Sequence, residues 1–424
     1  MLKVGALYSK EINIAIIAPM KLPATTPYPL LVVPLLIALF LSAFIYWEAL
    51  HLTSWILNTL SGLIAVYGLL VAPRKMLPIA GFWIGLLWFY WIGYSFTYYD
   101  MEWAKWPVAL GFGVVYALYF GVLGLTSSPW LRAGILFGLT FFWPMDFNWM
   151  QPEVIFVESY IGVEKWQFAL VLALLAASSG LKGKTKVLPL LLLVVTFHAP
   201  YTPPPLPSLK IKLVSTELSQ DMKWEQSTLQ RIVGDNLRVI DDAIDKRYDM
   251  VVLPEAAFPL FMNHNPQLMA FLQEKSHHIT ILTGTLHEEN HLNYNVSYLF
   301  DQGNVTVAKK TILVPFGEYI PLPSFLKQWV DDHVYQGAAN FVTAKHPTDF
   351  GIQGVTFRNA ICYEITREEL YDPKVHYMIA MSNNGWFTPS IQPTLQNLLI
   401  RLYARRNHAM VFHSANSGGS GVVY

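Results

Sequence analysis

Three residues in the second half of the chain could together turn a thiol into a nucleophile. Glu255 follows the apolar run VVLP, Lys310 lies within VAKKTILV, and Cys362, the single cysteine of the chain, follows FRNAI. A carboxylate can take the proton of the thiol, and a cation stabilises both a thiolate and the oxyanion of a tetrahedral intermediate. The three residue types therefore predict covalent catalysis at Cys362.

Each of these residues also has a structural explanation when it is considered alone. A glutamate after a strand is commonly a solvated turn carboxylate or a charge at a helix N-terminus. Lys310 could protect the edge of a sheet, and a lone cysteine is often a small buried hydrophobe. One cysteine forms no intramolecular disulfide, so Cys362 serves either packing or catalysis, and its two companions favour catalysis.

Short β-branched runs alternate with amphipathic stretches from residue 210 onwards. We expect strands at residues 210–218, 249–257, 278–286, 294–300, 304–314, 354–364, 376–386 and 410–416. Apolar residues spaced three and four apart predict helices at 224–247 and near 392–408. Strands interleaved with helices predict a layered α/β domain over residues 210–424, with the three candidates at or near strand ends.

The first half of the chain has a different composition. The whole chain is 53% hydrophobic and 14% charged, with a mean hydropathy of +0.35, which excludes an ordinary soluble protein of this length. A formal net charge of zero without a basic run excludes nucleic acid as a partner. The apolar character gathers before residue 200, and it predicts a helical membrane domain over residues 28–199.

Seven apolar segments are candidate membrane spans. They cover residues 28–48, 53–72, 76–95, 107–126, 131–147, 166–181 and 186–199. The last three are shorter than the roughly 20 residues that a helix needs to cross a bilayer.

The charges between these segments differ between the two sides of the predicted membrane domain. One side collects nine basic residues, namely Lys3, Lys10, Lys21, Arg74, Lys75, Arg132, Lys182, Lys184 and Lys186. The other side collects Glu48, Asp100, Glu102, Asp146, Glu153, Glu158 and Glu164, with Lys105 and Lys165 as its only bases. Because short cytoplasmic loops are enriched in Lys and Arg, we expect the N-terminus inside and everything after residue 200 outside.

Two short segments border these domains. Residues 1–27 have a short apolar run but no signal-peptide cleavage pattern, and we interpret them as a cytoplasmic or interfacial lead-in. The run HAPYTPPPLPSLK is rich in proline, which lacks an N–H and continues neither helix nor sheet. We therefore expect a linker at residues 200–209.

Several longer motifs resemble one known family. The run LVPFGEYIPL from Leu313 to Leu322, the triplet CYE at Cys362 and the run SNNGWF, behind an apolar first half, resemble the apolipoprotein N-acyltransferases of the nitrilase (carbon–nitrogen hydrolase) superfamily. The resemblance covers essentially the whole chain. It implies a multi-pass α-helical membrane domain followed by a nitrilase-like αββα sandwich.

The resemblance also implies roles for single residues. Glu255 matches the general base, Lys310 the oxyanion-stabilising lysine and Cys362 the nucleophile. Lys309 is a rival for the lysine, but the eight-residue spacing to Glu318 favours Lys310.

Further positions match supporting parts of the family's site. Glu318 matches a supporting carboxylate, and Tyr363 and Glu364 match the pair after the nucleophile, where the N–H of Tyr363 could donate to an oxyanion. Trp224 and Trp386 match aromatic positions on the lipid approach, and packing in an aromatic core is an equal alternative for both.

The sequence departs from the family pattern in two places. Where the family has Arg-Ala-x-Glu before the last matched strand, this chain has YARRNHAM, with Arg406 near the place of the glutamate. Relatives continue through further strands into a final transmembrane helix, whereas this sequence stops at Tyr424. We therefore expect a catalytic domain that is short at its C-terminus.

The implied activity is transfer of an acyl chain from a membrane phospholipid to the N-terminal amine of a diacylated lipoprotein through a thioester. The implied location is the bacterial inner membrane, with the catalytic domain on the periplasmic side, and no cofactor is needed. The alternatives are a membrane-tethered amidase or hydrolase and a truncated, non-catalytic binder of lipid or lipoprotein. A histidine cluster fits no zinc pattern, so we expect no metal; its members are His277, His278, His287 and His291.

Overall fold

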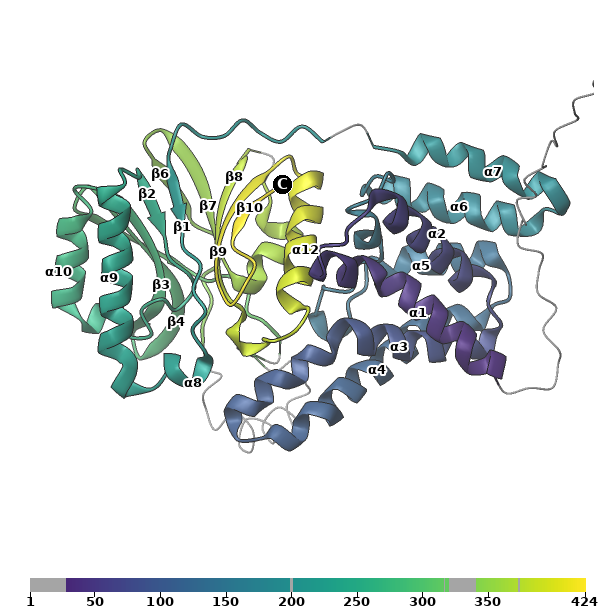
Figure 1. The fold of residues 1–424 in the computed structure, drawn as a ribbon, viewed down its shortest axis with the longest axis horizontal. Coiled ribbons are helices and arrows are strands. Elements are labelled where there is room, and N and C mark those ends of the chain that lie inside the picture. The colour runs from purple at the N-terminus through teal and green to yellow at the C-terminus, as the bar shows by residue number, and fades with distance from the viewer. Residues whose placement is uncertain (1–27, 199–200, 316, 320–340, 373) are drawn as a thin grey trace, which may run out of the picture.

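The computed structural model describes residues 28–198, 201–315, 317–319, 341–372 and 374–424. Within them the chain forms a helical part followed by an α/β part, and the two lie side by side along the long axis of the molecule (Figure 1). Residues 201–209 form neither helix nor strand. The predicted lead-in at 1–27 lies outside the described residues.

The helical part contains one α-helix in each apolar segment identified from the sequence. These helices are α1 (Tyr28–Ala49), α2 (Trp55–Val71), α3 (Leu77–Phe89), α4 (Lys105–Gly121), α5 (Pro129–Leu139), α6 (Lys165–Gly180) and α7 (Val187–Leu191). Short 3-10 turns lengthen several of them, among them η2 (Tyr90–Tyr99) after α3 and η3 (Glu102–Ala104) before α4.

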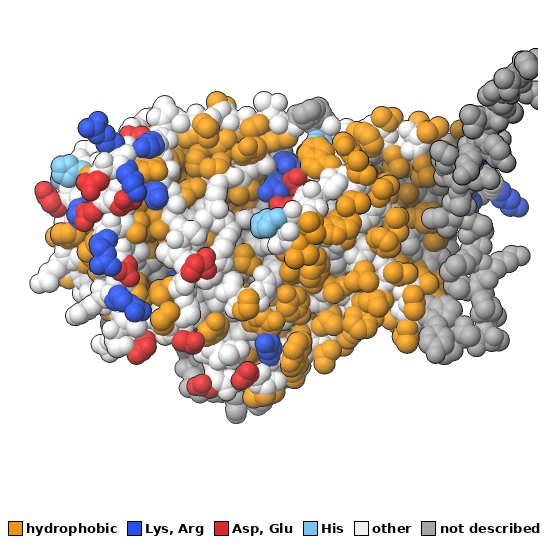
Figure 2. Space-filling view, in the orientation of Figure 1, with side chains coloured by type: hydrophobic (Ala, Val, Ile, Leu, Met, Phe, Trp, Pro, Cys, Tyr) orange, Lys and Arg blue, Asp and Glu red, His pale blue; other side chains and the backbone are white. Residues whose placement is uncertain are grey.

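Spanning length is reached by fewer segments than the seven predicted. Among the described residues, three helical stretches are long and apolar enough to cross a membrane: Leu30–Ala49, Arg74–Tyr99 and Glu102–Leu125. The helix Trp55–Val71 is apolar but shorter. Hydrophobic side chains cover much of the visible surface of this part, whereas charged side chains gather on the α/β part (Figure 2). The chain therefore has a membrane domain, and its count of seven crossings stays a prediction.

The α/β part contains two five-stranded sheets. The first has the order β1 (Ile211–Leu213), β2 (Met250–Val252), β3 (Thr280–Glu289), β4 (Leu292–Asp301) and β5 (Asn304–Lys309). Its first three strands are parallel and the last two are antiparallel to their neighbours. The helices α9 (Leu229–Asp245) and α10 (Pro266–Lys275) cover the outer face of this sheet (Figure 1).

The second sheet packs face to face against the first. Its order is β10 (Gly421–Val423), β9 (Met410–Asn416), β8 (Tyr377–Asn383), β7 (Val355–Ile361) and β6 (Asp349–Ile352). The shared core joins Val252 and Leu282 of the first sheet to Phe357, Ile379 and Phe412 of the second. The helix α12 (Gln392–Arg406) covers the outer face of the second sheet (Figure 1). The result is the predicted αββα sandwich.

The predicted strands are present, but their ends differ. The strand predicted at 304–314 ends at Lys309; the N–H of Lys310 still donates to the carbonyl of Asn295 at 3.0 Å, and the side chain of Lys310 is buried. The strand predicted at 210–218 is only Ile211–Leu213. The sequence analysis missed α10 as well as β6 and β10, which have four and three residues and are too short to show a period of two.

Helix α12 also joins the two domains. Its apolar side chains Leu395, Leu399 and Leu402 belong to the same buried core as the membrane helices. At its C-terminal end, Arg405 pairs with Glu158 at 2.9 Å and Arg406 pairs with Glu153 at 3.0 Å. The sandwich therefore buries one of its two helical layers against the membrane domain (Figure 1).

Arg406 therefore has a clear structural place, although the family pattern has a glutamate nearby. Besides its pair with Glu153, the guanidinium of Arg406 donates two hydrogen bonds to the carbonyl of Val163 in the membrane domain. Glu153 is fully buried and also pairs with Lys165.

Candidate active site

Lys310 and two carboxylates form the polar centre of the candidate site. Lys310 is 1% exposed, and its Nζ lies 2.8 Å from Oε2 of Glu318 and 3.8 Å from Oε1 of Glu255. Asn295, on β4, donates from Nδ2 to Glu255 at 2.8 Å and to Glu318 at 3.0 Å. Glu255 and Lys310 are therefore in contact with each other, and the charges of both act on the pKa of the Cys362 thiol. Asn295 is a further member of the candidate site that no sequence motif indicated.

Lys309 points away from this centre. Its amine pairs with Glu289 and lies 4.1 Å from the ring centroid of Tyr294. Neighbouring residues of a strand point to opposite faces, so only one of the two lysines can enter the site. The structure places Lys310 there, as the spacing to Glu318 predicted.

Cys362 follows the last residue of β7 and opens the 3-10 turn η12 (Cys362–Thr366). Its φ of 57° is left-handed, a conformation that is strained for a residue with a side chain and that is often found at functional sites. The carboxylate of Glu364 accepts N–H bonds from Ile361 at 2.8 Å and from Ile312 at 3.0 Å. Glu364 therefore fixes the turn of Cys362 to the segment that follows Lys310.

The surroundings set the charge of the thiol and of the amine. Burial raises the pKa of the Cys362 thiol above its usual range and Glu255 raises it further, while Lys310 and the N–H of Asn383 act in the opposite direction. Burial alone would lower the pKa of Lys310, but Glu318 and Glu255 outweigh it and raise that pKa. Lys310 is therefore a permanent cation, and the resting thiol keeps its proton.

The membrane domain supports the turn η12 directly. The Tyr363 hydroxyl donates to the carbonyl of Asp146 at 3.1 Å, and its ring stacks on Phe147 with centroids 5.9 Å apart. Trp149 Nε1 donates to Thr366 Oγ1 at 2.8 Å. Residues 146–149 lie between α5 and α6, and no motif in the sequence marked them as part of the site.

The turn that carries Glu255 depends on a close approach that the sequence did not reveal. Ala256 has a left-handed φ of 50°, and the backbone of Glu255 passes directly over Gly284 of β3. A Cβ on Gly284 would lie 2.6 Å from the Cα of Glu255. Glycine is therefore required at this position for the carboxylate to reach Lys310.

The two predicted aromatic positions have different surroundings. Trp224 follows α8 (Gln220–Lys223) and is 46% exposed, so it is not part of an aromatic core. Trp386 packs edge-on against Tyr98 of the membrane domain, with ring centroids 5.5 Å apart. The Tyr98 hydroxyl donates to the carbonyl of Gly385 at 3.2 Å. Trp386 thus lies at the junction between the two domains, and lipid binding by either tryptophan stays a prediction.

The part of the chain that the structure describes contains no group of three or more His, Cys, Asp or Glu side chains placed to hold a metal ion. Within the histidine cluster, Nδ1 of His287 lies 2.6 Å from the hydroxyl of Tyr298.

Comparisons with known proteins agree with this architecture. Residues 29–199 match the family model of the apolipoprotein N-acyltransferase integral membrane domain, and residues 218–424 match that of the carbon–nitrogen hydrolases. The fold and the cysteine site thus define a membrane-embedded member of the carbon–nitrogen hydrolase class. The chain belongs to the apolipoprotein N-acyltransferase family.

The similarity to individual relatives is extensive. The chain is 39% identical over 388 residues to the apolipoprotein N-acyltransferase of Wolinella succinogenes, which covers 91% of this chain and 94% of the relative. It is 35% identical over 378 residues to that of Helicobacter hepaticus, covering 87% and 94%. Among solved structures, XC1258 from Xanthomonas campestris, a CN-hydrolase superfamily protein, is 15% identical with a TM-score of 0.38 and covers 52% of this chain and 80% of its own.

Proposed function

We propose that this enzyme transfers an acyl chain from a membrane phospholipid to the N-terminal amine of a diacylated lipoprotein through a thioester on Cys362. The observation that carries the proposal is that Glu255 and Lys310 are in contact and both act on the Cys362 thiol, whose turn is also held by the membrane domain. Family membership supports an acyltransferase.

The first half-reaction forms the thioester. Glu255 takes the proton of the Cys362 thiol as the sulfur attacks the ester carbonyl of the phospholipid. The ammonium of Lys310 and the N–H of Tyr363 stabilise the oxyanion. The C–O ester bond then breaks, Glu255 returns the proton to the leaving oxygen, and a lysophospholipid departs.

The second half-reaction forms the amide. The α-amine of the lipoprotein's diacylglyceryl-cysteine attacks the thioester carbonyl and passes a proton to Glu255. Collapse of the oxyanion breaks the C–S bond, and Glu255 protonates the departing sulfur, which restores the resting enzyme. Both substrates are anchored in the membrane, so a membrane domain confines their encounter to two dimensions.

We also propose that the catalytic domain lies on the periplasmic side of the bacterial inner membrane. Glu48 and Glu158, which lie in loops predicted to be outside, both pair with Arg401 of α12. The basic loop containing Lys182 and Lys184 lies at the end of the helices away from the sandwich (Figure 1). The charge bias and the placement of the sandwich therefore agree.

The test is an intact-mass measurement of the purified enzyme after incubation with phospholipid vesicles. We expect a mass increase of one acyl group in the wild type and none in Cys362→Ser, because a serine hydroxyl is far harder to ionise than a thiol. Addition of a diacylated lipopeptide should remove the acyl group and yield a triacylated product.

The same measurement separates the alternatives. A hydrolase would release fatty acid continuously without an amine acceptor, and a non-catalytic binder would never gain the acyl mass. A Cys362→Ser enzyme that produces triacylated lipopeptide at a near wild-type rate would overturn the mechanism.

A further inference from the structure

A second lysine lies beneath the turn that carries Glu255. Lys223, the last residue of α8, is 3% exposed, and its Nζ donates to the main-chain carbonyl of Glu255 at 3.2 Å. Neither the sequence motifs nor the mechanism above uses this amine. Burial of an ammonium is costly unless the group is paired, so its presence here calls for a physical explanation.

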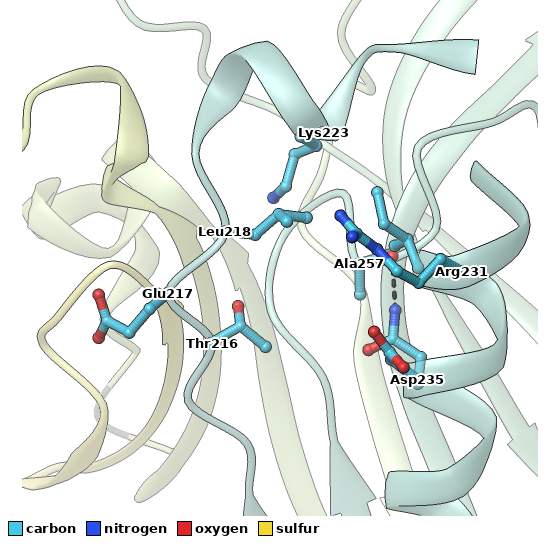
Figure 3. Close-up of a pocket in the computed structure, with 9 residues that line it drawn as sticks. Thr216, Glu217, Leu218, Lys223, Arg231, Asp235 and Ala257 are labelled. Atoms are coloured by element: carbon cyan, nitrogen blue, oxygen red, sulfur yellow. Dashed lines mark hydrogen bonds between the residues drawn. The ribbon is translucent and has the colours of Figure 1, made fainter. Parts of the chain in front are cut away.

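The amine lies beside a cavity on the outer side of this turn. The cavity has a volume of about 370 Å³, and Figure 3 shows the Lys223 side chain extending toward Leu218 at its wall. Arg231 and Asp235 of α9 also line it, and Glu217 extends away from the amine (Figure 3). Among the described residues, no carboxylate lies within 4.0 Å of the Lys223 amine.

The turn itself needs external support. Ala256 is left-handed, and the backbone from Pro254 to Ala256 passes so close to Gly284 that a Cβ there would lie within 2.8 Å of it. Two side chains from outside the turn hold its carbonyls: Lys223 binds that of Glu255, and Asn236 Nδ2 donates to that of Ala257 at 2.7 Å. The second bond is the dashed line in Figure 3. Of the two, only Lys223 brings a charge.

We propose that Lys223 is a positioning residue for the general base. Its ammonium anchors the main chain of Glu255 and so holds the carboxylate where it can accept the proton of Cys362. This inference rests on the proposed function, because it assigns Lys223 a task in the half-reaction that forms the thioester. Lys310 then serves the oxyanion and Lys223 serves the base.

The electrostatics agree with this geometry. Burial lowers the pKa of Lys223 to about 8, and the negative charge of Glu255 acts in the opposite direction. The amine is therefore charged at neutral pH and loses its charge as the pH rises above about 8. The other charged residues that line the cavity are Glu217, Arg231 and Asp235, and among the described residues Glu255 is the charged group that acts on the pKa of Lys223.

The experiment compares Lys223→Met, which removes the charge at similar length, with Lys223→Arg, which keeps it. Lys275→Met is the matched control, because Lys275 is also a partly buried lysine of the sandwich but pairs with Asp241 on the helical layer. The rate of acyl-cysteine formation from phospholipid vesicles is measured by intact mass from pH 5.5 to 9, and the melting temperature of each variant is recorded.

We expect Lys223→Met to slow acyl-cysteine formation by about tenfold at pH 7, while its melting temperature stays close to that of the wild type. Lys223→Arg should restore most of the rate, and Lys275→Met should match the wild type.

Four outcomes would overturn the inference. They are a Lys223→Met rate equal to that of the wild type, a loss of rate that Lys223→Arg does not restore, unfolding of both Lys223 variants, and a wild type that forms no acyl-cysteine. The second would exclude a role for the charge of Lys223, and the third would assign the residue to stability alone. The fourth would remove the proposed function together with the inference, whereas the first three leave the proposed function standing.

Discussion

At the scale of single residues, the candidate site consists of two carboxylates that share one ammonium and one amide. Glu255 and Glu318 would repel each other in a buried site without Lys310 between them. Asn295 adds one N–H bond to each carboxylate. Lys310 lies 2.8 Å from Glu318 and 3.8 Å from Glu255, so Glu318 is its closer partner.

The adjacent lysines offer a matched test of this arrangement. Lys310→Ala should abolish acyl-cysteine formation, because the oxyanion loses its cation and two buried carboxylates lose their partner. Lys309→Ala should keep most of the activity, since Lys309 pairs with Glu289 at the surface. Intact mass after incubation with phospholipid measures both. Equal losses of activity in the two variants would contradict the assignment of Lys310, and not Lys309, to the site.

The raised pKa of Cys362 predicts how the free enzyme reacts with iodoacetamide. Only the thiolate reacts, so alkylation should be slow at pH 7 and should increase about tenfold per pH unit up to pH 9. Glu255→Gln removes a negative charge beside the sulfur and should speed alkylation at each pH, although it slows acyl transfer. Mass spectrometry measures the extent of alkylation at Cys362, the single cysteine of the chain. A rate that is flat across this range would contradict a protonated resting thiol.

At the scale of elements, the reactive groups occupy turns at the ends of strands rather than the strands themselves. Ala256 and Cys362 are both left-handed, so each turn bends sharply away from its strand. Their partners come from other elements: Gly284 makes room for the first turn, and Glu364 ties the second to residues 311–312. These strained turns are stable because contacts from several neighbouring elements hold each of them in place.

Gly284→Val tests the closest of these approaches. The new side chain would collide with the backbone of Glu255, and overpacking of this kind costs about 1–3 kcal/mol of unfolding free energy. The melting temperature and the rate of acyl-cysteine formation should therefore both fall. Gly351→Val on β6 is the control, because no atom lies within 4 Å of a Cβ built there. Equal melting temperatures and equal rates in the two variants would contradict a steric clash between the new side chain at position 284 and the backbone of Glu255.

At the scale of the whole molecule, the two domains share one core and one ionic network. Helix α12 contributes its leucines to the membrane core, while Arg405 and Arg406 reach carboxylates in the loops of the membrane domain. The loop 146–149 completes the contact under Tyr363. The membrane domain thus also supports the turn that carries the candidate nucleophile.

The buried pair between Arg406 and Glu153 should be important for this joint. Arg406→Met leaves a fully buried carboxylate with Lys165 as its remaining cation, and loss of one partner of a buried pair costs roughly 3–5 kcal/mol. We expect a clear fall in melting temperature in detergent. Arg238→Met removes one partner of the exposed pair with Asp235 and should cost about 0–1 kcal/mol. Similar shifts for both variants would contradict a stabilising interface.

The charge bias of the loops predicts the orientation of the molecule. In a Cys362→Ser background, Asp100→Cys should react with a membrane-impermeant thiol reagent in intact spheroplasts. Lys184→Cys should react only after permeabilisation. Both positions are exposed in the structure, so burial does not explain a difference. The reverse pattern would place the catalytic domain on the cytoplasmic side.

Most elements and the candidate catalytic residues could be predicted from the sequence. Apolar runs located the seven α-helices that the structure describes in the membrane domain, because burial in lipid demands continuous hydrophobicity over many residues. Short β-branched runs located most strands, and the motifs around Glu255, Lys310 and Cys362 indicated the candidate site. The strand that we expected to end at residue 314 ends at Lys309. Apolar and β-branched residues continue beyond Lys309, but the pairing of β5 with β4 does not.

The distant segments that complete the candidate site are visible in the folded chain and not in its sequence. Asp146 and Tyr363 are 217 positions apart, and Lys223 meets the carbonyl of a residue 32 positions away. Local periodicity reports which face of an element is buried, but it carries no information on which side chain of another element lies opposite. The membrane-domain loop under the nucleophile, the amide of Asn295 and the second buried lysine therefore follow from the packing of the two sheets and α12, and they have no signature in the sequence.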